Sequence, residues 1–484
     1  MESFFKRYQN QSVLNTDSFD RRRFQKIYNM SGKLQELSEF EKPFPTFQAL
    51  LSDIWSAFYK MTPQLKDDEE IDDPIKTNHS LMNQMLNDGD FRKHREVTKL
   101  DELTSAIGTI KFGEKTKEWL EEQRQQNSEL NQQLQLIQSM QRQLEKQEKE
   151  NDAGQGNPQL ENDLENAVKN IHESVAQALQ KNRNSFSQKL VEAMTDTKNV
   201  KNGVKTLLGG TEQGSGEASL QKTPLRDQLK LAEKIAENEH LKSIAAWAGR
   251  FKTIAKQKQK SLYRDSVERS GVALGNRIEQ LLPSELALYG HENTRPDFLR
   301  RFAEGHTMQY DTKAKEALGK GPIILCLDQS GSMRKRDAQS KGFALALMSM
   351  AKRQKRDFCY IPFSTKVETY RYPKGKISTL EMIGLSESFL DGGTDFQMPL
   401  TQALKVINET RFKQSDIIFV TDGEANIKGN FLEKFMKAKK DKKFSVLSLV
   451  IGDGGLTRTP TQFSDRVITI TDLNDKGSYT AFEL

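Results

Sequence analysis

The stretch that most constrains the fold of this chain is Gly321–Ser332, with the sequence GPIILCLDQSGS. Five apolar residues follow a Gly-Pro pair, and a short apolar run without polar alternation is typical of a parallel strand buried on both faces. The run ends at Asp328, and a helical pattern begins soon after the hydroxyl residues Ser330 and Ser332. Because ligands of open α/β sheets bind at the carboxyl ends of the strands, this turn is predicted to be a binding site.

Two later stretches add further oxygen ligands. Thr394 follows a glycine pair, and Asp422 ends a strand-like run, DIIFVTD. The combined set has two carboxylates and three hydroxyls: Asp328, Ser330, Ser332, Thr394 and Asp422. Asp and Ser are also favoured helix caps, but five such residues in order at predicted strand and helix ends favour a metal site. Since Mg²⁺ prefers hard oxygen ligands in octahedral geometry, we expect Mg²⁺ or Mn²⁺ with one position left open.

The pattern Asp-x-Ser-x-Ser, then a Thr after a glycine pair, then Thr-Asp-Gly at a strand end, resembles the metal-ion-dependent adhesion site of von Willebrand factor A domains. All five ligand positions of that motif are matched in order. The resemblance implies a doubly wound, Rossmann-like α/β domain over residues 318–484. Alternating patterns agree with a mostly parallel sheet. Strands are predicted at 323–328, 358–364, 366–370, 417–421, 444–451 and 467–471, and helices at about 334–355, 379–386, 395–409 and 429–440.

The length of 484 residues allows several domains. Residues 1–200 have helical patterns, with a long helical arm around 114–195 in which polar residues interrupt a coiled-coil seam. A Gly-rich linker is expected at 201–224, and a helical connecting region at 225–317. The glycine-rich stretch lacks the lysine of a phosphate-binding loop, so no nucleotide site is predicted.

Composition restricts the partners and the compartment. The 73 basic and 67 acidic residues are well mixed and give a net charge of +6, which argues against a nucleic-acid binder. The sequence shows neither a signal peptide nor a run of about 20 apolar residues. Cys326 and Cys359 lie in apolar strand patterns and are expected to be buried free thiols of a reducing compartment. A cytoplasmic location is therefore expected, with peripheral membrane contact left open.

The segment Leu281–Tyr310, LLPSELALYGHENTRPDFLRRFAEGHTMQY, narrows the family. It resembles the region that precedes the metal-site domain in ViaA-type proteins, and the resemblance is specific over about residues 278–484. It implies a non-enzymatic adaptor or co-chaperone that binds a MoxR-family AAA+ ATPase through its von Willebrand factor A domain. Clients such as metal-cofactor or respiratory enzymes are implied in the same way.

Two other classes of function share parts of this pattern. A Mg²⁺-dependent phosphotransferase would use Asp328 as its nucleophile, but such enzymes need a second Asp two positions later, where this chain has Ser330. A chelatase-like metal-insertion subunit would share the domain type and an AAA+ partner, but the N-terminal helical region gives it no support.

Overall fold

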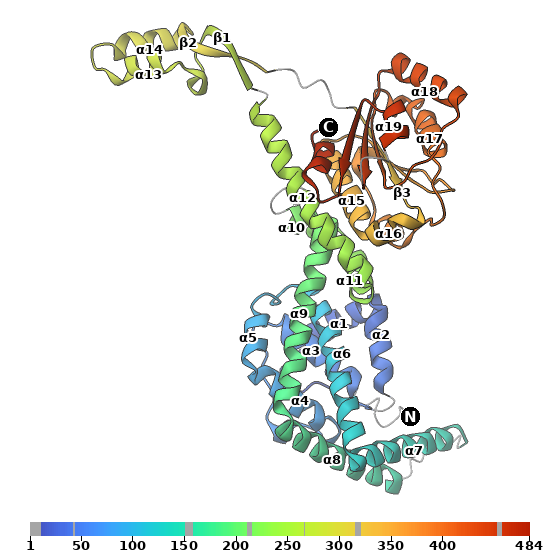
Figure 1. Ribbon diagram of the computed structural model, residues 1–484. Coiled ribbons are helices and arrows are strands. Elements are labelled where there is room, and N and C mark those ends of the chain that lie inside the picture. Colours follow the sequence, from blue (N-terminus) through green and yellow to red (C-terminus); the bar gives the residue numbers. More distant parts are fainter. Residues whose placement is uncertain are drawn as a thin grey trace. The chain divides into compact units, whose positions relative to one another are not determined.

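The computed structural model describes residues 11–41, 44–150, 158–210, 215–265, 267–314, 321–452 and 457–484. The chain forms two compact units. The first comprises Met1–Leu208 and Glu217–Lys242, and the second comprises Gly209–Gly216 and Ser243–Leu484. Helices dominate the first unit, whereas the second contains the large sheet (Figure 1).

The helices of the N-terminal region follow one another closely. They are α1 (Ser18–Met30), α2 (Gly32–Ser38), α3 (Phe47–Tyr59), α4 (Lys76–Asn87), α5 (Gly89–Arg95), α6 (Glu102–Gln126), α7 (Ser128–Glu150), α8 (Pro158–Lys181), α9 (Arg183–Leu208), α10 (Ser215–Lys222) and α11 (Leu225–Glu237). The helical character predicted for this region is confirmed. No helix in the described ranges has the length and apolar character that a membrane span requires.

The predicted helical arm consists of α6 and α7 packed against α8 and α9. Ser174 Oγ donates to Gln133 Oε1 at 3.2 Å, and Asn182 Nδ2 donates to Gln123 Oε1 at 2.8 Å. Gln123 precedes Gln133 in the sequence, but its partner Asn182 follows Ser174. The α6–α7 side of the arm therefore runs antiparallel to the α8–α9 side. The predicted seam contributes fully buried apolar residues, among them Leu130, Leu134 and Ile137.

The segment between the helical arm and the large sheet differs from expectation in two places. α9 continues to Leu208 and α10 begins at Ser215, so much of the expected 201–224 linker is helical, and residues 211–214 lie outside the described ranges. The expected helical region 225–317 contains α12 (Glu239–Asp265), α13 (Pro283–Gly290) and α14 (Arg295–Ala303). It also contains an antiparallel pair of strands, β1 (Val267–Gly275) and β2 (Thr307–Ala314). The alternating side chains of Val272 and Leu274 fit a strand, whereas the flanking helical patterns suggested continuous helix.

The large sheet has six strands in the order β5-β4-β3-β6-β7-β8. They are β3 (Ile323–Asp328), β4 (Phe358–Phe363), β5 (Tyr370–Tyr372), β6 (Asp416–Thr421), β7 (Ser445–Ile451) and β8 (Arg466–Ile470). All neighbouring pairs are parallel except β4 and β5. The predicted doubly wound α/β fold is confirmed. The strand expected at 366–370 lies instead at β5, which pairs only its three residues with β4.

Helices cover both faces of this sheet, as the complete burial of β3 requires. They are α15 (Asp337–Arg353), α16 (Thr379–Glu387), α17 (Gln397–Ile407), α18 (Gly429–Lys442) and α19 (Arg458–Phe463). Ile324 and Cys326 belong to a core cluster that includes Leu400 of α17 and Phe435 of α18. Cys326 and Cys359 are buried free thiols, as expected.

The C-terminal part of α12 belongs to the same compact unit as the sheet and packs on α15. The rings of Phe251 and Phe343 meet edge to face with centroids 5.5 Å apart, and Phe482 lies 5.1 Å from Phe343. This unit therefore begins earlier in the sequence than the domain predicted at 318–484. Lys252 of α12 is buried, and its Nζ donates to the Gly209 carbonyl at 2.5 Å.

The close contact between α12 and α15 predicts that a methyl group added at Gly342 of α15 lowers the stability of the second unit. A Cβ on Gly342 would lie 2.6 Å from Trp247 Cβ and 2.9 Å from the Ala248 nitrogen. Because backbone cannot yield cheaply, Gly342→Ala should destabilise this unit by about 1–3 kcal/mol. Gly384→Ala in α16 is the matched control, since no atom lies within 4 Å of its Cβ position. Chemical denaturation measures both, and equal midpoints would contradict the packing.

A buried histidine predicts acid sensitivity of the first unit. His94 is 3% exposed beside the rings of Phe58 and Phe112, and within the described ranges neither ring nitrogen has a hydrogen-bond partner. Burial, followed by the charges of Lys198 and Lys201 on α9, lowers the pKa of His94 to about 4. The unfolded chain therefore binds the extra proton first as the pH falls below about 6.5.

The stability that neutral His94 contributes is thus complete above pH 6.5 and is lost as the pH falls towards 4. We expect the free energy of unfolding to fall by about 2 kcal/mol between pH 7 and 5 from this residue alone. The variant His94→Leu should lack that share of the pH dependence. Denaturant titrations of both proteins at several pH values measure it, and identical slopes would show that His94 is not responsible.

Candidate metal centre

The five predicted ligand residues lie where neighbouring parallel strands end. Asp328 is the last residue of the central strand β3, and Asp422 directly follows β6. The two strands are paired in register, with Leu327 opposite Val420. Their carboxyl ends therefore bring both carboxylates to the same edge of the sheet, at the position where open α/β sheets bind ligands.

Asp328 is held by hydrogen bonds on both of its oxygens. Oδ1 accepts from the Ser330 backbone nitrogen at 2.9 Å, and Oδ2 accepts from Thr421 Oγ1 at 2.6 Å. The residue is only 1% exposed. Burial raises the pKa of Asp328, the hydrogen bonds from Thr421 and Ser330 oppose that rise, and the nearby Asp422 charge adds to it. The site thus contains a buried carboxylate that a cation would stabilise.

A chain of hydrogen bonds joins the two serines to Asp422. The hydroxyls of Ser330 and Ser332 lie 3.1 Å apart, and Ser332 Oγ donates to Asp422 Oδ1 at 2.6 Å. Because Ser332 has one hydroxyl proton and gives it to Asp422, Ser330 is the donor in the serine pair. Four of the five predicted residues therefore belong to one connected cluster.

Thr394, the fifth predicted residue, comes from a separate loop next to Asp422. A Cβ on Gly423 would lie 3.3 Å from Thr394 Oγ1. The loop is attached to the serine turn because the Gly331 nitrogen donates to the Gly392 carbonyl at 2.9 Å. Gly392 has a φ of 93°, a conformation that favours glycine. The first glycine of the pair before Thr394 is therefore required by the backbone conformation of this loop.

Two arginines of the serine turn pair with acids at this edge. Arg336 Nη1 lies 3.2 Å from Asp422 Oδ2. Arg334 pairs instead with Asp391 and lies over the Phe389 ring, 5.4 Å from its centroid. Neither arginine was predicted from the sequence, because neither belongs to the ligand motif.

The donor set fits a hard divalent cation. It combines two carboxylates with three neutral hydroxyls, the ligand type that Mg²⁺ and Mn²⁺ accept. Within the described ranges no group of three or more His, Cys, Asp and Glu side chains is arranged for a metal, so hydroxyl oxygens would have to complete the shell. Ser332 is exposed, whereas Asp328 is buried. The cluster is thus accessible from the serine side.

Thr421 is a residue of the candidate metal centre that the sequence prediction missed. It was noted only as part of the Thr-Asp-Gly motif, yet its fully buried hydroxyl bridges β6 to Asp328 and also accepts from the Gly423 nitrogen at 3.1 Å. Its position in the sequence could have identified Thr421, because it is the last residue of β6, the strand that pairs with β3.

The variant Thr421→Val keeps the shape of this side chain and removes its hydroxyl. Asp328 then loses a donor in a buried place, which should cost about 1–3 kcal/mol of stability in chelator. Thr461→Val, at an exposed helical threonine that donates only to its own helical turn, serves as the control. Thermal unfolding compares them, and a Thr421→Val protein as stable as wild type would remove Thr421 from the site.

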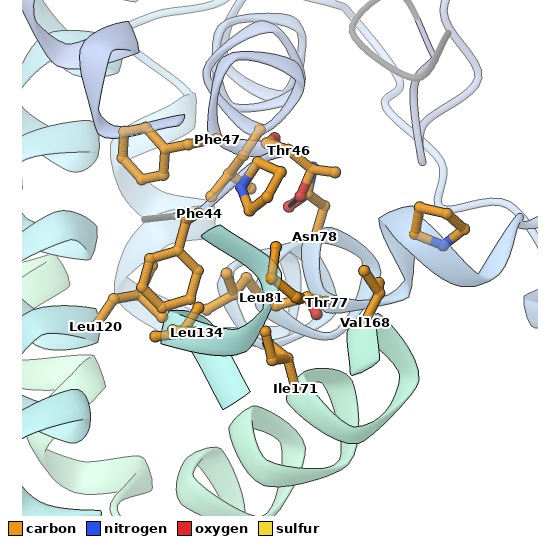
Figure 2. A pocket seen from close by; sticks show the side chains of 14 residues that line it. Phe44, Thr46, Phe47, Thr77, Asn78, Leu81, Leu120, Leu134, Val168 and Ile171 are labelled. Atoms are coloured by element: carbon orange, nitrogen blue, oxygen red, sulfur yellow. Dashed lines mark hydrogen bonds between the residues drawn. The ribbon is translucent and has the colours of Figure 1, made fainter. Parts of the chain in front are cut away.

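A pocket in the first unit is a poorer candidate for chemistry. Figure 2 shows it between the Phe44–Phe47 segment, α4 and the α6–α8 arm. It holds about 410 Å³ of empty space, open solvent included, and its 14 lining residues include no ionisable side chain. Thr46 and Asn78 satisfy each other through two hydrogen bonds. An apolar cavity of this kind offers no acid, base or nucleophile, so the metal centre is the stronger site.

The match to a protein-family model agrees with the fold. Residues 323–424 match the family model described as von Willebrand factor type A domain. The second unit therefore contains a von Willebrand factor A domain. Among solved structures, one described as von Willebrand factor type A from Catenulispora acidiphila is 16% identical and covers 34% of this chain and 41% of that chain, at a TM-score of 0.28.

Relatives extend the match beyond this domain. An uncharacterised protein of Methanocaldococcus jannaschii is 29% identical over 470 residues, which are 96% of this chain and 97% of the relative. Regulatory protein ViaA of Proteus mirabilis is 26% identical over 253 residues, 46% of this chain and 52% of its own length. ViaA of Edwardsiella ictaluri is 32% identical over 173 residues, 32% of this chain and 35% of its own length. The chain therefore contains a von Willebrand factor A domain, and it is similar to the named ViaA proteins over part of its length.

Proposed function

We propose that this protein is a non-enzymatic adaptor that binds a partner protein through a metal ion in its von Willebrand factor A domain. The ligands are Asp328, Ser330, Ser332, Thr394 and Asp422, and the cation is Mg²⁺, with Mn²⁺ as the alternative. The observation that carries the proposal is the convergence of Asp328, Ser330, Ser332 and Asp422 at the ends of β3 and β6, with Ser332 open to solvent. Thr394 comes from the neighbouring loop, next to Gly423.

The ligand chemistry suggests how such a site would bind a protein. A bound divalent cation would supply a Lewis-acidic position for a carboxylate of the partner. The three neutral hydroxyls leave more positive charge on the ion than carboxylates would. Asp328 and Asp422 hold the cluster together through Thr421 and Ser332, so the partner's carboxylate would meet a preformed surface.

The similarity to ViaA-type proteins supports a MoxR-family AAA+ ATPase as the partner. Relatives named regulatory protein ViaA also support a regulatory or adaptor role, in which the ATPase supplies the energy. In this proposal the pair acts in the cytoplasm on client proteins such as metal-cofactor or respiratory enzymes, without nucleic acid.

The residue at position 330 argues against the phosphotransferase alternative. Such an enzyme would need a second Asp two positions after Asp328 to act as acid and base. This chain has Ser330 there, and its hydroxyl lies 3.1 Å from that of Ser332. No observation favours the chelatase-like alternative over the adaptor.

The adaptor proposal predicts that Asp328→Asn loses both metal and partner. The amide keeps the size of the side chain but removes the charge that holds the cation, so affinity for the ATPase should fall at least about tenfold in Mg²⁺. Asp441→Asn, at an exposed position on α18, is the control. Calorimetric titration with MgCl₂ and pull-down of the ATPase in Mg²⁺ or chelator measure the effects. Equal binding of the ATPase by Asp328→Asn and wild type would exclude the metal bridge.

A further inference from the structure

Arg336 occupies a special position at the metal centre. Its Nη1 lies 3.2 Å from Asp422 Oδ2, while the other oxygen of Asp422 accepts from Ser332. The Asp422 side chain is 5% exposed, so its negative charge is largely removed from water. Both oxygens are thus engaged by groups of the same short turn, Gly331–Arg336. Arg336 is the cation that balances this carboxylate.

We propose that Arg336 is an internal counter-ion that competes with the divalent cation for Asp422. Metal binding would displace the guanidinium, which then becomes available at the rim of the site to pair with the carboxylate that the partner brings. This inference rests on the proposed function and describes how the same site would be regulated. When the metal ion is bound, the partner contacts both the ion and the released Arg336; when it is absent, neither is available to the partner.

Electrostatics sets the direction of this coupling. A guanidinium and a divalent cation on the same carboxylate repel each other, and the repulsion is strong where water is excluded. The Arg336 side chain is 37% exposed, so it has solvent to move into without a change in the backbone. Guanidinium groups also bind carboxylates through two parallel hydrogen bonds, which suits the capture of an acidic side chain.

Arg334 provides a matched comparison in the same turn. It carries the same charge two positions earlier, but it pairs with the exposed Asp391 and lies over Phe389. Its removal changes the net charge near the site by the same amount and leaves the Asp422 contact intact. A difference between the two variants therefore reports the specific pair and not the general field of the turn.

The test uses the full chain with Arg336→Gln and Arg334→Gln. Calorimetric titration with MgCl₂ and MnCl₂ should show metal affinity about three- to tenfold higher for Arg336→Gln than for wild type, and a change below about twofold for Arg334→Gln. In chelator, Arg336→Gln should melt at a lower temperature than wild type, because Asp422 has lost its counter-ion. Its melting temperature should rise more than that of wild type when Mg²⁺ is added.

The outcomes separate this inference from the proposed function. Unchanged or weaker metal binding by Arg336→Gln, with normal binding by wild type, overturns the counter-ion role and leaves the metal bridge standing. An equal gain for Arg334→Gln also overturns it, because the effect then belongs to net charge. If neither wild type nor any variant binds a divalent cation, the metal centre and the counter-ion role both fall.

Discussion

The hydrogen bond from Thr421 to Asp328 is the contact on which the centre depends. It joins the ends of two adjacent buried strands, and it places a carboxylate where water scarcely reaches. An ionised group in such a place is unfavourable unless donors or a cation compensate it. Two hydrogen-bond donors compensate the charge of Asp328 in part, while burial keeps the pKa of this carboxyl raised. A cation at this edge would compensate the remaining charge.

The rest of the site follows from how the backbone reaches this edge. β3 and β6 supply the carboxylates because they are neighbours in the sheet, although Asp328 and Thr421 are 93 positions apart in the sequence. The serine turn and the Thr394 loop are then joined through backbone, at Gly331 and Gly392. This backbone hydrogen bond holds the two turns beside each other, so the side chains of the candidate site come from connected segments.

Much of this could be predicted from sequence because the signals are local. An apolar run such as Ile323–Leu327 indicates a buried strand by itself. The three residues of Asp-x-Ser-x-Ser lie within five consecutive positions, so their proximity follows from the sequence alone. The roles of Thr421 and Arg336 could not be predicted, since each depends on a partner that only the folded sheet brings near. The β1–β2 pair was missed because its period-two pattern is short and flanked by helices. The contact of α12 with α15 depends on the absence of one side chain, at Gly342, and a lone glycine in a helical pattern does not reveal which neighbour approaches it.

The packing of α12 has a consequence for how the chain folds as it is synthesised. Phe251 is covered by Phe343 and Phe482, and Lys258 pairs with Glu483, 225 positions further along the sequence. A nascent chain therefore carries the aromatic face of α12 uncovered while the whole sheet is still being made. Contacts between such distant residues form late. The second unit should thus reach its native state only after residue 483 leaves the ribosome, and until then Phe251 lacks the two rings that cover it.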